Sequence, residues 1–95
     1  MGVDDSVLQR RFRDVNPTGP EFLLADLDLA MAFMDVAEAS RIEQRRRRNH
    51  DNARTAYDTI LRLLENLRPS LAERQAIDAK LAILKMRLQA VGQQF

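Results

Sequence analysis

The sequence predicts an all-α protein, an antiparallel three-helix bundle preceded by a short N-terminal helical leader. Three long segments, at about residues 20–40, 43–68 and 70–91, repeat apolar side chains every three or four residues, which is the spacing of one helix face. Leucine, alanine and arginine, which all favour helix, dominate the composition. The connections between the segments are short, so neighbouring helices are expected to run antiparallel.

The chain has 95 residues, which is the size of one domain. We divide it into a leader and Pro/Gly linker at 1–19, the three-helix bundle at 20–92 and a tail at 93–95. Within the leader, Ser6 and Gln9 form a pattern that caps a short helix, and proline and glycine residues then interrupt that helix.

The first bundle helix begins at a capping-box pattern formed by Thr18 and Glu21. Most of its acids gather on one narrow strip and the rest of the cylinder is apolar, so we expect this helix to be the most buried. Asp26 is the exception, because it falls on the apolar side, where an unpaired carboxylate would be costly. We therefore expect Asp26 to reach the rim of the core or to find a partner, which can be Arg68, Arg74 or the N-terminus of the third helix.

The second and third helices meet at Pro69, because the residue before a proline is pushed away from helical backbone angles. Ser70 and Glu73 form a second capping-box pattern, and Gly92 suits the end of the third helix. The expected core stripes are Ala53, Ala56, Tyr57, Ile60, Leu63, Leu64 and Leu67 on the second helix, and Ile77, Leu81, Leu84, Leu88 and Val91 on the third.

Charge is strongly segregated along the chain, although the net charge is only +1. Residues 20–40 hold five acids and no base, whereas residues 41–68 hold eight arginines and four acids. The simplest interpretation is internal, with the acidic helix lying beside the basic helix. An external acidic partner is the alternative.

Four consecutive arginines provide an alternative function, the binding of a polyanion or nucleic acid through Arg45, Arg46 and Arg48. Successive helical residues point about 100° apart, so only part of the run can face one phosphate backbone. Acids and bases also alternate along the outer face at spacings that allow pairing, which is typical of a solvated helix: Glu43, Arg47, Asp51, Arg54, Asp58, Arg62 and Glu65.

Arg46, Asn49 and His50 continue the core stripe of the second helix with polar groups beyond Ala53. They predict a polar end to an interhelical groove, where the backbone or a carboxylate of a partner can be held. His50 is the only histidine and the chain has no cysteine, so we predict no metal site.

The third helix carries a second apolar strip, and one three-helix core cannot use both strips equally. Leu8 and Phe12 of the leader are one candidate cover for it, and a partner helix or a second copy of the chain is the other. The residues of this second strip, the predicted partner-binding residues, are Ala76, Ala79, Ile83, Met86 and Ala90.

Several classes of protein are not predicted. The sequence shows no nucleophile with a base, no metal cluster and no phosphate-binding loop, so we predict neither an enzyme nor a cofactor. The longest apolar run, Leu29 to Met34, is too short to cross a membrane, and no signal peptide is visible. The lack of cysteine fits a reducing compartment. We expect a soluble, cytoplasmic protein.

The segment 52–67, with Ala53, Ala56, Tyr57 and Ile60, resembles the second helix of tetratricopeptide-like repeats and of microtubule-interacting-and-trafficking (MIT) domains. The run from Leu71 to Leu88 is similar to their third helix. The resemblance implies a helical bundle that binds peptide segments in interhelical grooves. We therefore predict a non-catalytic protein–protein interaction module, which binds a partner helix or itself through the outer face of the third helix.

Overall fold

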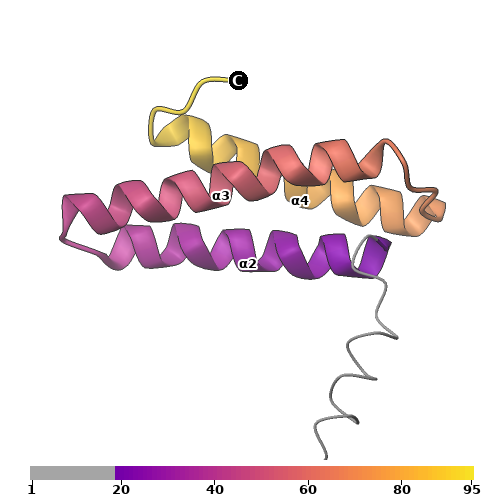
Figure 1. Ribbon diagram of the computed structural model, residues 1–95, viewed down its shortest axis with the longest axis horizontal. Helices are drawn as coiled ribbons and strands as arrows, with labels where there is room; N and C mark the ends of the chain where they lie inside the picture. Colours follow the sequence, from indigo (N-terminus) through magenta and orange to yellow (C-terminus); the bar gives the residue numbers. More distant parts are fainter. Residues whose placement is uncertain (1–18) are drawn as a thin grey trace, which may run out of the picture.

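The computed structural model describes residues 19–95, so the expected leader helix lies outside the described residues. Within that range the protein is an all-α three-helix bundle, as predicted, with α2 at Pro20–Ala39, α3 at Glu43–Leu64 and α4 at Leu71–Ala90. Figure 1 shows the chain running along α2, returning along α3 and then following the direction of α2 again along α4.

The start of α2 differs from the prediction. Gly19 occupies the N-cap position, with an extended backbone and no side chain that could accept a hydrogen bond. The N-cap predicted at Thr18 is therefore wrong by one residue, and Thr18 itself lies outside the described residues. The helix nevertheless begins at Pro20, because proline needs no partner for a backbone N–H in the first turn.

The end of α3 also differs, because the regular helix stops at Leu64 and not at residue 68. Beyond it, the backbone N–H of Leu67 donates to the Leu64 carbonyl at 3.3 Å, a tighter bond spanning three residues. Two features therefore end α3. Its last turn is tightened, and Pro69 disfavours helical backbone angles at Arg68.

The predicted boundaries of α4 are confirmed by their hydrogen bonds. The Ser70 hydroxyl accepts from the Glu73 N–H at 3.1 Å, and the Ser70 N–H donates to the Glu73 carboxylate at 2.8 Å. At the other end the N–H groups of Gly92 and Gln93 donate to the carbonyls of Gln89 and Leu88, each at 3.0 Å. This Schellman turn requires a positive φ at the first of these donors, and Gly92 supplies it with φ 99°.

The core forms along one face of each helix. Helix α2 contacts both neighbours more extensively than α3 and α4 contact each other, so it is the central helix. Fully buried alanines at its contacts let the backbones approach closely, whereas larger side chains fill the centre. The buried side chains are Leu23, Leu27, Ala30, Met34, Ala37, Ala53, Tyr57, Ile60, Leu64, Ile77, Leu81, Leu84 and Leu88.

Helix α2 has more buried side chains than α3 or α4, as expected, but its outer face is not buried. Leu29 and Val36 are 51% and 54% exposed, although both lie on the apolar part of the cylinder. Two neighbouring helices cover only part of a cylinder, so within residues 19–95 the side of α2 opposite the core is left uncovered.

Helix α2 lies beside the arginine-rich α3, as predicted, but its acidic strip pairs with α4. Lys80 bonds to Asp28, and one guanidinium nitrogen of Arg87 lies 2.9 Å from the Asp35 carboxylate and 3.2 Å from that of Glu38. Burial alone would lower the pKa of Arg87, but the hydrogen bonds that it donates to these two carboxylates, together with their charge, outweigh burial and raise the pKa. We call this set the ion-pair ladder.

The ion-pair ladder also fixes how α2 and α4 lie relative to each other. Asp28 and Asp35 are seven residues apart, and so are their partners Lys80 and Arg87. Two pairs with the same spacing and the same order require the two helices to lie side by side and to run in the same direction.

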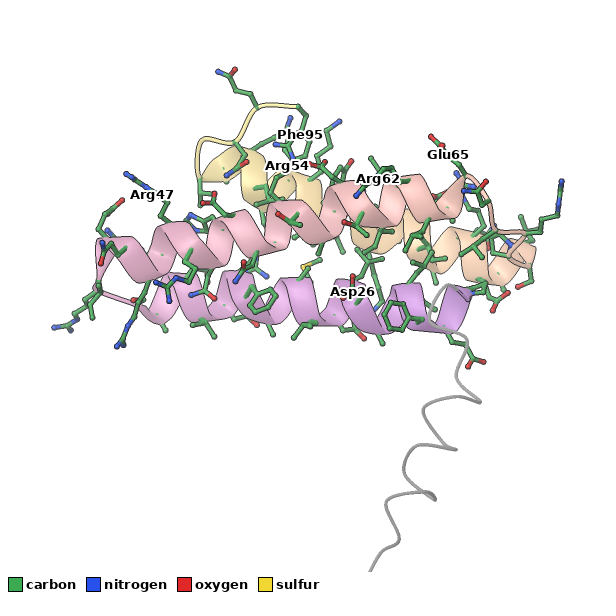
Figure 2. All side chains as sticks on the ribbon, viewed as in Figure 1. Asp26, Arg47, Arg54, Arg62, Glu65 and Phe95 are labelled. Carbon is green, nitrogen blue, oxygen red and sulfur yellow. The ribbon has the colours of Figure 1, made fainter. Side chains whose placement is uncertain are left out.

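Asp26 does not form the expected ion pair within residues 19–95. Arg74, one of its two predicted partners, instead bonds to Asp78 on its own helix at 3.0 Å. Asp26 is half-buried, and in Figure 2 it points from α2 toward α3. Partial exposure lets water solvate the carboxylate, so an internal partner is not required.

Candidate interaction surfaces

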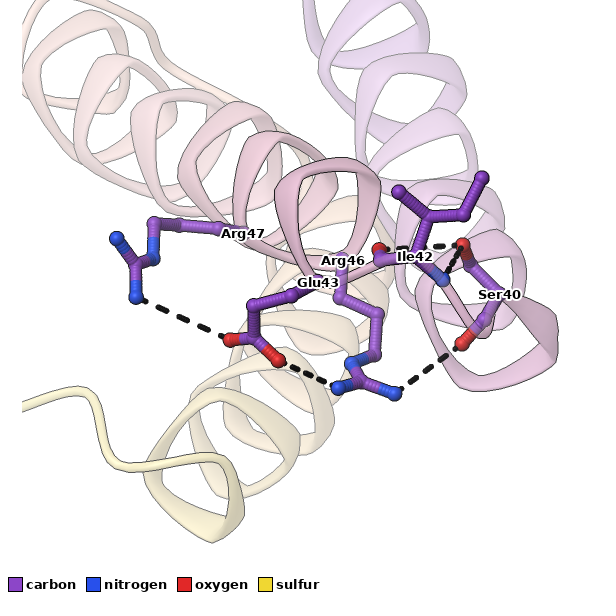
Figure 3. Close-up of polar contacts among 5 residues, drawn as sticks. All are labelled: Ser40, Ile42, Glu43, Arg46 and Arg47. Carbon is purple, nitrogen blue, oxygen red and sulfur yellow. Dashed lines mark hydrogen bonds and ion pairs between the residues drawn. The ribbon is translucent and has the colours of Figure 1, made fainter.

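Arg46, the first of the predicted site residues, lies near the start of α3, and its side chain reaches back to the turn between α2 and α3 (Figure 3). Its guanidinium donates to the Ser40 carbonyl at 3.3 Å and to the Glu43 carboxylate at 2.5 Å. The Ser40 hydroxyl in turn accepts from the Ile42 N–H at 3.2 Å. Arg46 therefore stabilises the turn, and its predicted role as a polyanion contact is weakened.

The Arg46→Ala substitution is expected to raise the pKa of Glu43. The hydrogen bond from Arg46 is the main cause that lowers this pKa, and the charge of Arg46 adds to it. A carboxyl group whose pKa is lower in the folded protein than in the unfolded protein stabilises the fold at pH values above its unfolded pKa. This stabilisation is lost as the pH falls through the folded pKa. Carbon-13 NMR titration of the Glu43 carboxyl measures the shift. Arg45→Ala is the control, and an equal shift in both variants would contradict the assignment.

A polar cleft of about 380 Å³ opens between the start of α3 and the turn after α4. Of the three residues predicted for a polar groove end, Arg46 and His50 line this cleft. Asn49 does not line it, because its amide donates to the Arg45 carbonyl at 2.8 Å. The other lining residues are Glu43, Arg47, Asp51, Val91, Gly92 and Gln93. The mixture of charges suits hydrogen bonding to a peptide more than binding of a polyanion.

The arginine run divides into two pairs. Arg46 and Arg47 both lie near Glu43, Arg47 at 3.8 Å, whereas Arg45 and Arg48 are exposed and form no ion pair within residues 19–95. Of the predicted polyanion set of Arg45, Arg46 and Arg48, only Arg45 and Arg48 remain without an ion pair to a carboxylate within residues 19–95.

The three residues after the α4 turn fold back onto α3, which was not predicted from the sequence. The Phe95 ring packs edge-on against Tyr57, with ring centres 5.1 Å apart, and the Arg54 guanidinium lies 3.9 Å from the centre of the same ring. Arg54 also donates to the Gln94 carbonyl at 2.7 Å and pairs with Asp58 at 3.2 Å. Figure 2 shows Phe95 and Arg54 together above α3.

The predicted partner-binding residues of α4 share one outer face. Ile83 is 46% exposed and Met86 is 64% exposed, and Ala79 and Ala90 are also exposed. Ala76 is half-buried. This face, which we call the α4 outer strip, is open among the described residues, and the ion-pair ladder runs along its α2 side.

A second apolar surface, on α2, was missed. It consists of exposed side chains that repeat at spacings of three and four residues, and we call it the α2 outer stripe: Phe22, Ala25, Leu29, Ala32, Val36 and Ala39. The spacing was visible in the sequence. It was attributed to burial because a sequence does not show how many neighbours surround a helix.

Within residues 19–95 no group of histidine and acidic side chains is arranged to hold a metal ion. No helix in this part of the chain has both the length and the apolar content needed to span a membrane. No protein-family model, curated protein or solved structure matches the chain.

Proposed function

We propose that this protein is a non-catalytic helical interaction module, which binds a helix of another chain against the α4 outer strip. The exposure of Ile83 and Met86 on the outside of a folded bundle carries the proposal. An apolar strip at helical spacing fits the apolar face of a second helix. Alanines in the strip permit close backbone approach, and the flexible Met86 adapts to an irregular surface.

Three further features support this proposal. Helix α4 packs against α2 through its buried face and the ion-pair ladder, so the strip lies on a helix that is already folded into the bundle. The pattern resemblance to MIT domains and tetratricopeptide-like repeats favours binding of peptide segments. A sequence without cysteine also suits the cytoplasm, where we place this interaction.

Photo-crosslinking in cells of the source organism tests the proposal. A benzoylphenylalanine placed at Met86 is expected to give a discrete adduct, whereas the same group at Asp78, on another side of α4, gives none. Adding Ile83→Asp is expected to abolish the Met86 adduct, because binding would bury an unpaired charge. Equal adducts at both positions, or an adduct that survives Ile83→Asp, would exclude this surface.

Polyanion binding is the second candidate. Arg45 and Arg48 favour it, because both are exposed and neither forms an ion pair in the described part of the chain. Two phosphate contacts predict a slope of about −1.4 to −1.8 for log affinity against log salt concentration. A fluorescence titration against duplex and single-stranded nucleic acid measures that slope. At about 50 mM salt the attraction between the two arginines and the phosphates is only weakly screened. Lack of binding under these conditions would remove this candidate.

A further inference from the structure

The α2 outer stripe alternates large and small side chains. Phe22, Leu29 and Val36 lie seven residues apart and are 36%, 51% and 54% exposed. Exposed alanines, at positions 25, 32 and 39, stand between and after them with the same seven-residue repeat. A seven-residue apolar repeat is the pattern by which one helix packs along another.

The order of large and small side chains along the stripe is complementary to the same order read in the opposite direction. If a second copy of α2 is laid antiparallel on the first, with the two-fold axis between Ala30 and Met31, each large side chain meets an alanine. Phe22 then faces Ala39 of the second copy, and Leu29 faces Ala32 of the second copy. The Val36 side chain likewise faces Ala25. A bulky group opposite an alanine fills the interface without overlap or cavity.

We propose that the α2 outer stripe is a self-association surface, on which a second copy of this chain packs with its α2 antiparallel. A parallel pair would place Phe22 against Phe22 and Ala25 against Ala25. That arrangement alternates crowded layers with empty ones, so the size pattern selects the antiparallel orientation. The surface is separate from the α4 outer strip.

The charges beside the stripe fit the same arrangement. Asp26 lies on the α3 side of α2. Helical periodicity places Arg45 on the same side of α3 as the partly buried Ala56 and Leu63, and Arg48 farther round toward the outside. In the antiparallel pair, Asp26 is level with Asp35 of the second copy. Since the α2–α3 turn is centred near residue 41, that level corresponds to about residue 47 of the second copy's α3, two residues from Arg45. The dimer therefore brings this carboxylate toward Arg45 of the second copy, and neither group forms an ion pair within one chain's residues 19–95.

Sedimentation equilibrium of the full chain tests the surface. The wild type is expected to show twice the 10.9 kDa chain mass at high micromolar concentration. Leu29→Asp is expected to weaken dimerisation by about 100-fold, because it would bury an unpaired charge in the central layer. Ile83→Asp, a matched change at a residue of similar exposure on α4, is expected to leave dimerisation unchanged.

Other outcomes of this experiment identify other occupants. A wild-type monomer at about 0.5 mM, a concentration at which even a weak complex near −5 kcal/mol forms, would overturn the proposal and leave the stripe to residues 1–18 or another protein. A dimer lost in Ile83→Asp but kept in Leu29→Asp would move self-association to α4, which overturns this inference while supporting the proposed function. Circular dichroism of both variants verifies that each remains helical.

Disulfide trapping tests the orientation independently, because the chain contains no cysteine. When Ala25→Cys and Val36→Cys chains are mixed, the antiparallel pair is expected to yield mainly the mixed disulfide. Two equivalent positions 25 would lie about 16 Å apart, from eleven residues at 1.5 Å each, which is too far for a disulfide. Predominance of the two homodisulfides in the mass spectrum would show a parallel pair and overturn the proposed orientation.

Discussion

Replacement of Leu84 by alanine is expected to lower the free energy of unfolding by about 2.7–5 kcal/mol, because it removes buried methyl groups and leaves a cavity. Leu84 is fully buried in the core that all three helices share. A domain of this length has a total stability of about 5–10 kcal/mol. One such cavity therefore removes a large part of the stability, and we expect a much lower midpoint of unfolding.

Urea denaturation followed by far-ultraviolet circular dichroism measures this loss. Leu71→Ala is the matched control, because it makes the same change on the same helix at a side chain that is 76% exposed. That control is expected to change the free energy of unfolding by less than about 0.5 kcal/mol. Similar losses at both positions would show that Leu84 is not in a closed core.

The Phe95→Ala substitution is expected to lower the free energy of unfolding by about 1–2.5 kcal/mol. The edge-to-face contact with Tyr57 contributes about 0.5–1.5 kcal/mol, and the guanidinium of Arg54 adds about 0.5–1 kcal/mol at an exposed site. The same ring makes both contacts, so one substitution removes both. The hydrogen bond from Arg54 to the Gln94 carbonyl would weaken as well.

Tyr57 is a specific reporter of this contact, since the chain has one tyrosine and no tryptophan. Its near-ultraviolet circular dichroism is expected to fall in Phe95→Ala and to stay unchanged in Gln94→Ala, whose side chain is exposed. A double-mutant cycle with Arg54→Met isolates the guanidinium–ring interaction. A signal from Tyr57 that ignores Phe95 would show that the two rings do not pack together in solution.

Local sequence patterns predicted most of the fold. The apolar repeats located all three helices, and the capping box of Ser70 with Glu73 and the positive φ of Gly92 appear where they were predicted. Each of these features depends on a few neighbouring residues. The errors lie where two local preferences compete, as at Gly19 against Thr18, or where a proline acts over several residues, as in the early end of α3.

The candidate surfaces were predicted less completely. Ile83 and Met86 were predicted as surface residues because α4 carries two apolar strips, and only one of them can face the core. Both strips can be recognised within a single segment of the sequence. The surface of Leu29 and Val36 was missed because α2 is apolar on nearly all sides, and a helical wheel does not show which side the neighbours leave open. The contact of Phe95 with Tyr57 joins residues that are far apart along the chain.

By itself the sequence determined that this chain forms helices, approximately where each begins and ends, and most of the core stripes of α3 and α4, because periodicity and capping act within a few residues. Only the tertiary structure decided that the acids of α2 pair with Lys80 and Arg87 of α4, that Arg46 stabilises the α2–α3 turn, and that α2 keeps an open apolar face. These features depend on the direction in which one helix lies from another. That direction is set by packing of the whole core, to which every segment contributes at once.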